Sequence, residues 1–491
     1  MKKTLTFCTF GITVALAGCG GRAVLQPPAV VVPVDSAAVK RSLLAARIDS
    51  LLADSALAQA AVGACIVEVD GGKREIYARN KASLFVPASV NKLFTAAAAL
   101  RQWGPYHRFA TLVCGDSIDA RGRIGGSLYL KGLGAPDLRV PDLDRLAFAL
   151  KSRGLRLVDG DLVADAQFFD TAGYGAGWMW EDGQYAYGAQ VSALSLAGNA
   201  FDLGIAPSAG NGARPAVELD PPSGYFRLDN RAVTGRPGSR RSLRVSRAAS
   251  GSQDVVAVTG SLPRDAGPLF LSRSVSSPVL YCATAFREAL ARRGIRIAGK
   301  IRSGAAPDSL PVLASLSSRP LHAIVRDMNK DSDNFTAEML FRGLNAALAL
   351  PDTGLNAPAL YLQGLGFPPG SYRIADGSGL SRYNLCTPEQ VAAGLLALYG
   401  DPLLRPELLV SLPVAGIDGT LSRRMAEGEA AARVRAKTGT MTGVSCLAGF
   451  AHGSSGAVYC FALMFNNHPC KADQVRPIQD EILRLLLAIE P

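Results

Sequence analysis

The stretch Ser89-Val90-Asn91-Lys92 places a hydroxyl and an amine three residues apart, at the start of an alanine-rich run that continues to Ala99. Because alanine has the highest helix propensity, we expect this run to be a helix that begins near Ser89. Residues at positions i and i+3 share one helix face, so the amine of Lys92 can reach the hydroxyl of Ser89. A serine hydroxyl is a poor nucleophile until a base takes its proton, and a neutral Lys92 is the candidate base.

Two further short motifs follow in the chain, Ser332-Asp333-Asn334 and Lys437-Thr438-Gly439. A Ser-x-x-Lys pattern fixes only two positions, so by itself it arises by chance in many chains of this length. The chain has only 12 lysines, however, with a single Ser-x-x-Lys and a single Lys-Thr-Gly. The ordered set of three motifs therefore predicts a serine-lysine acyl-transfer site.

The middle motif offers polar groups for a substrate and for proton transfer. Asn334 carries both a donor and an acceptor for a substrate amide. Ser332 can pass a proton between Lys92 or Lys437 and a leaving amine. The same motif also suits the N-cap of a helix that begins near Phe335, and the two roles are compatible.

The third motif lies in the alternating stretch 432–440, which predicts an edge strand that bounds a cleft and can pair with a peptide substrate. Lys437 and Thr438 are expected to hold a substrate carboxylate by charge and hydrogen bond. Gly439 lets the backbone approach the substrate closely. Lys437 is also a second cation that, together with burial, would lower the pKa of Lys92 from its usual value of about 10.4.

Composition limits the class of protein. The chain of 491 residues, 48% apolar with 51 Gly and 29 Pro, is typical of a folded protein of two or three domains. Its net charge of +11 comes mostly from dispersed arginine. The densest run is Arg240, Arg241, Arg244 and Arg247, and it lacks the interleaved aromatic residues of a nucleic-acid platform. We therefore expect a solvated surface there and no nucleic-acid partner.

The N-terminus has the pattern of a signal peptide. Lys2 and Lys3 precede the apolar run 5–16, which is too short to span a membrane. The segment Leu16-Ala17-Gly18-Cys19 resembles the lipobox of bacterial lipoproteins, which implies cleavage before Cys19, lipidation of its thiol and attachment to a membrane. A plain secretory signal cleaved nearby is the alternative. We expect a signal peptide at 1–19, a linker at 20–36, and a lipid-anchored protein of the cell envelope or periplasm.

The cysteines and histidines indicate neither a disulfide framework nor a metal site. Once Cys8 and Cys19 are set aside, seven scattered cysteines remain, and their spacing gives no disulfide framework. The four histidines are isolated and lack metal-ligand spacing. We expect neither a metal site nor a cofactor.

The motifs and their spacing resemble a known family. The first gap is 243 positions and the second is 105, and secondary signatures occur at 376–382 (Asp-Gly-Ser-Gly-Leu-Ser-Arg) and at 412–421. The set is similar to the penicillin-recognising serine acyltransferases, and among them to the class C low-molecular-mass penicillin-binding proteins, the D-alanyl-D-alanine carboxypeptidase/endopeptidase family. This resemblance implies an α/β transpeptidase/β-lactamase-like catalytic domain interrupted by two inserted, mainly β domains.

The resemblance also implies the domain boundaries. The catalytic domain is expected at 37–115 and 300–491, the first inserted domain at 116–204 and 271–299, and the second at 205–270. Within the catalytic domain we expect a hairpin at 62–77, strands at 446–451 and 457–465 and a helix at 473–489. The inserted region has Gly-punctuated strands and one clear helix at 141–153.

Several site roles follow from the resemblance alone. The backbone N–H groups of Ser89 and Thr440 match the family's oxyanion hole. Asp182, Tyr187 and Arg382 match positions that recognise the diaminopimelate side of the stem peptide. Each of the three also has a structural alternative: a turn residue, a packed aromatic and a surface ion pair, respectively.

The function implied is that of a penicillin-sensitive serine DD-peptidase, which cleaves D-Ala-containing bonds of peptidoglycan through an acyl-enzyme on Ser89 and is inhibited by β-lactams. Carboxypeptidase and endopeptidase activities both remain possible. A serine β-lactamase or esterase is one alternative, against which stand the long insertion and the lack of a Glu-x-x-Leu-Asn segment after Ser89. A catalytically silent cell-wall-binding lipoprotein is another, against which stands the complete set Ser89, Lys92, Ser332, Asn334 and Lys437.

Overall fold

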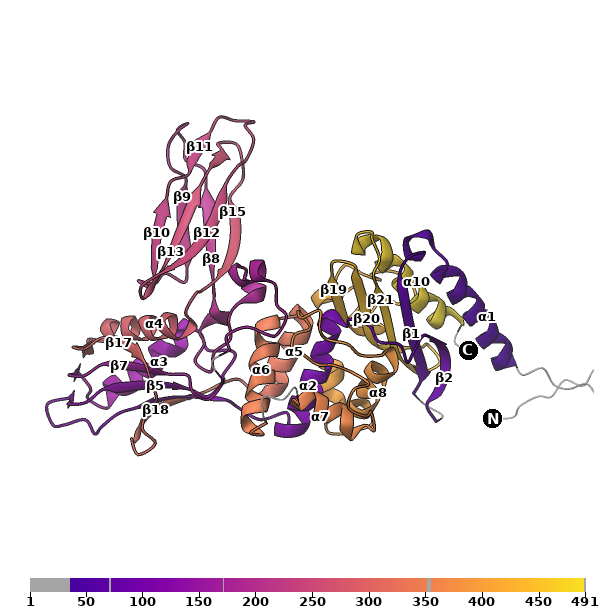
Figure 1. Ribbon diagram of the computed structural model, residues 1–491, viewed down its shortest axis with the longest axis horizontal. Helices are drawn as coiled ribbons and strands as arrows, with labels where there is room; N and C mark the ends of the chain where they lie inside the picture. The colour runs from indigo at the N-terminus through magenta and orange to yellow at the C-terminus, as the bar shows by residue number, and fades with distance from the viewer. Residues whose placement is uncertain (1–35, 70–71, 171, 351–354, 490–491) are drawn as a thin grey trace, which may run out of the picture.

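The computed structural model describes residues 36–69, 72–170, 172–350 and 355–489. The molecule is elongated (Figure 1): a sheet-and-helix body that holds both ends of the described chain lies at one end, a second body lies at the other, and a β tower rises from the second body. The predicted signal peptide, Cys19 and most of the linker lie outside the described residues. Within the described part, no helix is both long and apolar enough to span a membrane.

An antiparallel five-stranded sheet forms the centre of the first body. Its order is β19-β20-β21-β1-β2, so strands from both ends of the chain pair with each other. The strands are β1 (Ala61–Glu68), β2 (Arg74–Arg79), β19 (Val434–Met441), β20 (Val444–His452) and β21 (Val458–Asn466). The predicted hairpin and closing strands are therefore confirmed, although residues 70 and 71 of the turn are outside the described part.

Helices cover both faces of this sheet (Figure 1). Alternate side chains of a strand point to opposite faces, and they divide here between two apolar cores. One core is closed by α1 (Ser36–Leu52) and α10 (Ala472–Ile489), as predicted for the last helix. The other core is closed by helices that include α2 (Lys92–Trp103) and α8 (Pro388–Tyr399), which places the alanine-rich segment against the centre of the sheet.

Four more helices complete this body, and two of them flank the Ser332-Asp333-Asn334 motif. The four are α5 (Leu321–Asp331), α6 (Asn334–Ala347), α7 (Ala357–Gly364) and α9 (Arg405–Ser411). The motif lies where α5 ends and α6 begins, and both helices contact α2.

The second body has a five-stranded sheet in the order β17-β7-β5-β3-β18 and a small sheet in the order β16-β6-β4. The large sheet comprises β3 (Ala110–Cys114), β5 (Leu128–Gly132), β7 (Leu162–Asp165), β17 (Ile301–Ser303) and β18 (Val312–Ser317). The small sheet comprises β4 (Arg123–Ile124), β6 (Leu157–Val158) and β16 (Arg296–Ile297). Helix α3 (Val140–Ser152) is the predicted one, whereas α4 (Pro278–Arg292) was not expected.

The boundaries of this body differ from the predicted ones. Strand β3 and strands β17 and β18 fall in segments assigned above to the catalytic domain. However, β3 pairs with β5, β17 pairs with β7 and β18 pairs with β3. An alternating apolar pattern indicates a strand but does not indicate which sheet the strand joins. On this pairing we propose that the first inserted domain begins near 110 and ends near 317.

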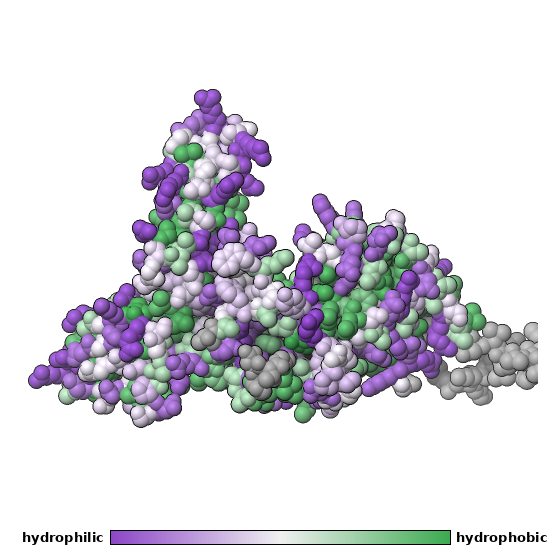
Figure 2. Space-filling model, viewed as in Figure 1, coloured by the Kyte–Doolittle hydropathy of each residue, from purple (hydrophilic) through white to green (hydrophobic). Residues whose placement is uncertain are grey.

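The tower contains three small sheets, with orders β15-β8-β9, β10-β13-β12 and β11-β14. Its strands are β8 (Ala200–Ala206), β9 (Ala216–Asp220), β10 (Phe226–Asn230), β11 (Val233–Gly235), β12 (Arg244–Ser250), β13 (Gln253–Thr259), β14 (Ser261–Pro263) and β15 (Leu269–Ser274). Strands β8 and β15 extend past the predicted limits of 205 and 270. Figure 2 shows hydrophilic side chains over the outer part of the tower. Arg240, Arg241 and Arg244 are exposed, as expected.

Candidate active site

Ser89 lies in a tight turn that leads into α2. Residues Ala88–Asn91 form a 3-10 turn, and the α-helix begins at Lys92, three residues later than the alanine-rich pattern predicted. Side chains at i and i+3 eclipse in a 3-10 turn, so this geometry brings the Ser89 and Lys92 side chains together more directly than an α-helix would. Lys92 Nζ lies 2.9 Å from Ser89 Oγ. Ala88, just before the serine, has φ +47°, a conformation that costs energy in a non-glycine residue.

The Lys92 amine is fully buried and has three partners. Besides Ser89 Oγ, it donates to Asn334 Oδ1 at 2.7 Å and to the Ser378 carbonyl oxygen at 2.7 Å. Burial lowers the pKa of Lys92 to about 8, although the nearby carboxylates of Asp333, Asp376 and Glu338 oppose the shift. A neutral amine has two N–H groups and one lone pair. Since Asn334 Oδ1 and the Ser378 carbonyl can only accept, the lone pair is left for the Ser89 hydroxyl proton.

Ser332 and Lys437 form a second serine-lysine pair. Lys437 Nζ donates to Ser332 Oγ at 2.7 Å and to the Thr438 carbonyl oxygen at 2.9 Å. Lys437 is fully buried, and burial, reinforced by the charge of Lys92, holds the pKa of its amine well below the usual value. Ser332 ends α5 in the left-handed conformation, with φ +59°.

The Ser332-Asp333-Asn334 motif also caps a helix, as predicted. The Asp333 carboxylate accepts the backbone N–H groups of Phe335 and Thr336 at the start of α6. This cap fixes the turn from which Ser332 faces Lys437 and Asn334 faces Lys92. The predicted cap is therefore confirmed, and the chemical role of the motif stays a prediction.

Strand β19 is at the edge of its sheet, as predicted, and it packs against the Ser89 turn. A Cβ atom on Gly439 would lie 2.6 Å from the Pro87 carbonyl oxygen and 3.2 Å from the Ser89 nitrogen. Glycine is therefore required for the close approach of β19 to the Ser89 turn, rather than only for the approach of a substrate. Thr438 Oγ1 donates to Thr420 Oγ1 at 2.8 Å, and Arg476 from α10 donates to Thr440 Oγ1 at 3.1 Å.

The structure brings Asp182 and Tyr187 together and places them beside Asn334. Both lie in a loop of short 3-10 turns, Trp180–Gln184 and Ala186–Gly188. Tyr187 Oη donates to Asp182 Oδ1 at 2.9 Å, and the Tyr187 carbonyl accepts from Asn334 Nδ2 at 3.0 Å. Burial and the bond to Asp182 raise the pKa of Tyr187 to about 12. Arg382 is exposed and donates instead to the Thr442 carbonyl oxygen at 2.7 Å, next to the end of β19.

Residues of the tower form hydrogen bonds with this loop. These contacts were not predicted from the sequence. Ser274 Oγ donates to the Gly183 carbonyl at 2.6 Å, and Arg247 Nη2 donates to the same carbonyl at 3.1 Å. Tyr185 forms a β-bridge with Arg273, whose guanidinium lies 5.1 Å from the Tyr185 ring centre. Arg247 had been grouped with a solvated basic run, because its partner is 64 positions away in the chain.

Asp376 organises the loop behind Lys92. Its carboxylate accepts from the Gly379 nitrogen at 2.8 Å, the Ser381 nitrogen at 2.6 Å and Trp178 Nε1 at 3.0 Å. The motif at 376–382 was visible in the sequence, but the contact with Trp178 depends on tertiary structure. Glu338 was missed altogether, although it follows Asn334 by one helical turn.

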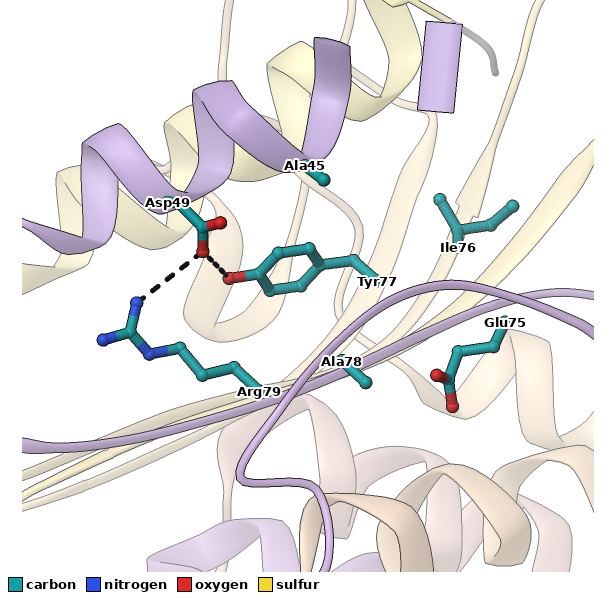
Figure 3. A pocket seen from close by; sticks show the side chains of 7 residues that line it. All are labelled: Ala45, Asp49, Glu75, Ile76, Tyr77, Ala78 and Arg79. Atoms are coloured by element: carbon teal, nitrogen blue, oxygen red, sulfur yellow. Dashed lines mark hydrogen bonds and ion pairs between the residues drawn. The ribbon is translucent and has the colours of Figure 1, made fainter. Parts of the chain in front are cut away.

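One cleft of the structure lies at these residues, and a smaller pocket lies away from them. A cleft of about 1010 Å³ opens at the Ser332-Asp333-Asn334 turn and lies among α5, the second body and the foot of the tower. A smaller pocket, of about 450 Å³, lies between α1 and β2 (Figure 3). There Asp49 Oδ1 accepts from Tyr77 Oη at 2.6 Å and pairs with Arg79 at 3.7 Å, and no motif residue lines the pocket. Among the described residues, no group of three or more His, Cys, Asp or Glu is placed to hold a metal ion.

Comparison with known proteins agrees with this geometry. The model of the D-Ala-D-Ala carboxypeptidase 3 (S13) family matches residues 44–488. A D-alanyl-D-alanine carboxypeptidase of Actinomadura sp. (strain R39) is 39% identical over 450 residues, covering 88% of this chain and 83% of that protein. The crystal structure of penicillin binding protein 4 (dacB) from Haemophilus influenzae superposes with a TM-score of 0.78 at 26% identity, covering 89% of this chain and 98% of that one. The same protein complexed with a β-lactam superposes with a TM-score of 0.73 at 25% identity, with the same coverage of both chains.

Proposed function

The chain belongs to the D-Ala-D-Ala carboxypeptidase 3 (S13) family and is a penicillin-sensitive serine DD-peptidase, and we propose that Ser89 is its nucleophile and Lys92 its base. The contact of 2.9 Å between Lys92 Nζ and Ser89 Oγ carries this proposal. Burial of the amine supports it, because a lysine with a pKa of about 8 is neutral in about one molecule in ten at pH 7, a far larger neutral fraction than an ordinary lysine has. The relatives do not favour the alternatives of a β-lactamase, an esterase or a silent lipoprotein.

The proposed reaction has two halves. Lys92 takes the Ser89 proton while Oγ attacks the carbonyl carbon of the D-Ala residue, and the resulting oxyanion is bound by the backbone N–H groups of Ser89 and Thr440. The C–N bond then breaks. Ser332, bonded to Lys437, hands its proton to the departing amine and takes up in its place the proton that Lys92 removed from Ser89, so Lys92 is neutral again and an acyl-enzyme on Ser89 remains. Water, deprotonated by the same base, hydrolyses the ester and regenerates the serine.

Substrate would bind along the edge of β19 beyond Ala436, because the first part of that edge pairs with residues 413–415. Lys437 and Thr438 would hold the carboxylate of the leaving group, and the amide of Asn334 would contact the peptide backbone. Asp182, Tyr187 and Arg382 would recognise the diaminopimelate side of the stem peptide. The Asp182–Tyr187 bond and the tie between Tyr187 and Asn334 support this for the first two. Arg382 would act from the opposite side, near Thr442.

The reaction class and the relatives place the enzyme at the cell wall. We further propose that the chain is a lipoprotein anchored through Cys19 in the envelope or periplasm, on the support of the Leu16-Ala17-Gly18-Cys19 segment. Mass spectrometry of the protein purified from its native membrane tests this. A diacylglyceryl adduct on a peptide that begins at Cys19 is expected, and an unmodified N-terminus would contradict the anchor.

Covalent labelling tests the nucleophile. Fluorescent penicillin should tag the wild-type protein and fail to tag Ser89→Ala, whereas Ser192→Ala, a change elsewhere in the chain, serves as a control that keeps the label. Equal labelling of Ser89→Ala would contradict the proposal. Digestion of purified muropeptides, followed by product analysis, then separates release of free D-alanine from cleavage of cross-linked dimers.

A further inference from the structure

Glu338 is a buried carboxylate beside the site that the mechanism above does not use. It lies in α6 one turn after Asn334, and only 1% of its surface is exposed. Its Oε1 accepts the backbone N–H of Ser378 at 2.7 Å. A buried charge is costly unless it is hydrogen-bonded or paired, so its position next to a catalytic lysine calls for an explanation.

The Ser378 backbone connects Glu338 to Lys92. The carbonyl of Ser378 accepts from Lys92 Nζ at 2.7 Å, while its N–H is held by Glu338. The following N–H, that of Gly379, donates to Asp376 Oδ1 at 2.8 Å. The peptide group whose carbonyl binds Lys92 therefore donates its own N–H to Asp376, and the peptide group just before it donates its N–H to Glu338. The two carboxylates thus fix the backbone on both sides of the Ser378 Cα atom.

The charges around the two groups are mixed. Lys92 faces the carboxylates of Asp333, Asp376 and Glu338, and Lys437 lies close enough for the two cations to repel. Burial, followed by the charge of Asp376, raises the pKa of Glu338 to about 7, and Arg342 on the same helix opposes that shift. Glu338 thus changes charge in the pH range just below that in which Lys92 does.

We propose that Glu338 is a positioning residue for Lys92: it holds the backbone N–H of Ser378, whose carbonyl is the amine's acceptor, and it places a buried carboxyl group beside the base. The inference rests on the proposed function of Lys92. Its consequence is visible in the pH dependence of acylation. As pH rises through 7, Glu338 loses its proton, and the new charge makes Lys92 retain its own. Between about pH 7 and 8, the logarithm of the wild-type acylation rate should therefore rise with pH less steeply than it would if a single group titrated.

The variant Glu338→Gln keeps an oxygen for the Ser378 N–H but removes the charge. The rate of acylation of this variant by fluorescent penicillin, measured from pH 6 to 9, should follow the titration curve of a single group. Its midpoint should lie at a lower pH than that of the wild type. Near pH 7.5, the acylation rate of the variant, divided by its own maximum at high pH, should be about threefold or more above the same ratio for the wild type. At low pH the two profiles should converge. The control Glu389→Gln, which removes an exposed carboxylate from α8, should leave the wild-type profile unchanged.

The outcomes separate the two proposals. Loss of labelling in Ser89→Ala, combined with identical profiles for wild type and Glu338→Gln, would overturn the role of Glu338 and leave the nucleophile in place. Labelling of Ser89→Ala would overturn the proposed function itself. If Glu338→Gln does not fold, the wild-type profile still decides, because a one-proton acid limb contradicts joint titration of the two groups.

Discussion

Lys437 Nζ lies 2.7 Å from Ser332 Oγ, and this pair repeats, across the site, the arrangement of Lys92 and Ser89 at 2.9 Å. Both amines are fully buried, and the charge of Lys92 helps to lower the pKa of Lys437, whereas burial, rather than the predicted charge of Lys437, lowers the pKa of Lys92. One pair activates the nucleophile in the proposed mechanism, and the other serves the leaving group. It is energetically costly for both lysines to be charged at once. The site can therefore accept one proton and release another.

The pKa of Lys92 predicts how acylation depends on pH. Burial lowers this pKa to about 8, and only the neutral amine can accept the Ser89 proton. The rate of acylation by penicillin should therefore rise with pH, reach half of its maximum near pH 8 and level off above about pH 9. Stopped-flow labelling over that range measures it. Lys92→Arg, which stays charged throughout, should lose at least about a hundredfold at every pH, and a flat wild-type profile would contradict Lys92 as the base.

Gly439→Ala should impair acylation strongly. The new Cβ would meet backbone atoms of Pro87 and Val90 at 2.6 and 3.1 Å, and neither can move without displacing the Ser89 turn. We expect the acylation rate to fall by about a hundredfold or more, because an error of about 1 Å at a reacting group costs that much. Gly125→Ala, where the added Cβ meets open space, is the matched control. A fully active Gly439→Ala protein would contradict the close packing of β19.

Arg247→Ala should separate peptide hydrolysis from β-lactam acylation. Arg247 ties the tower to Gly183, in the turn that carries Asp182, but it does not contact Ser89 or Lys92. We expect KM for a diaminopimelate-containing peptide to rise about fivefold, a loss of about 1 kcal/mol that is comparable to the net worth of one ordinary hydrogen bond. Acylation by a small penicillin should stay within about twofold of wild type. The exposed Arg244→Ala serves as control, and equal losses for both ligands would indicate general damage instead.

Tyr77→Phe should affect stability alone. The Tyr77 hydroxyl joins edge strand β2 to α1 through Asp49 (Figure 3). Tyr77 belongs to the apolar core on the opposite face of the sheet from the core that contains α2. Removing it should lower the free energy of unfolding by about 1 kcal/mol, the usual net worth of such a bond. Denaturant unfolding measures this, with the exposed Tyr106→Phe as control. A change in penicillin acylation would show that the two faces of the sheet are coupled.

The elements nearest the motifs were the most predictable. Strands β20 and β21 and helix α10 have uninterrupted apolar or strictly periodic patterns, which local sequence reveals directly. Helix α4 was missed because the glycine-rich strands around it dominated the interpretation of that region. The domain limits were displaced because hydrogen-bond partners, rather than strand patterns, decide which sheet β3 and β18 join.

The sequence by itself determined the chemistry: an ordered set of Ser89, Lys92, Ser332, Asn334 and Lys437 whose types and spacing admit few other reactions. Only the tertiary structure decided the environment of those groups. Three features depend on contacts between segments far apart in the chain. They are the burial of both lysines, the close approach of Gly439 to the Ser89 turn, and the hydrogen bonds from the backbone at Ser378 and Gly379 to Glu338 and Asp376. The physical reason is that residue type fixes which atoms can react, whereas a pKa and a distance depend on what the fold places around them.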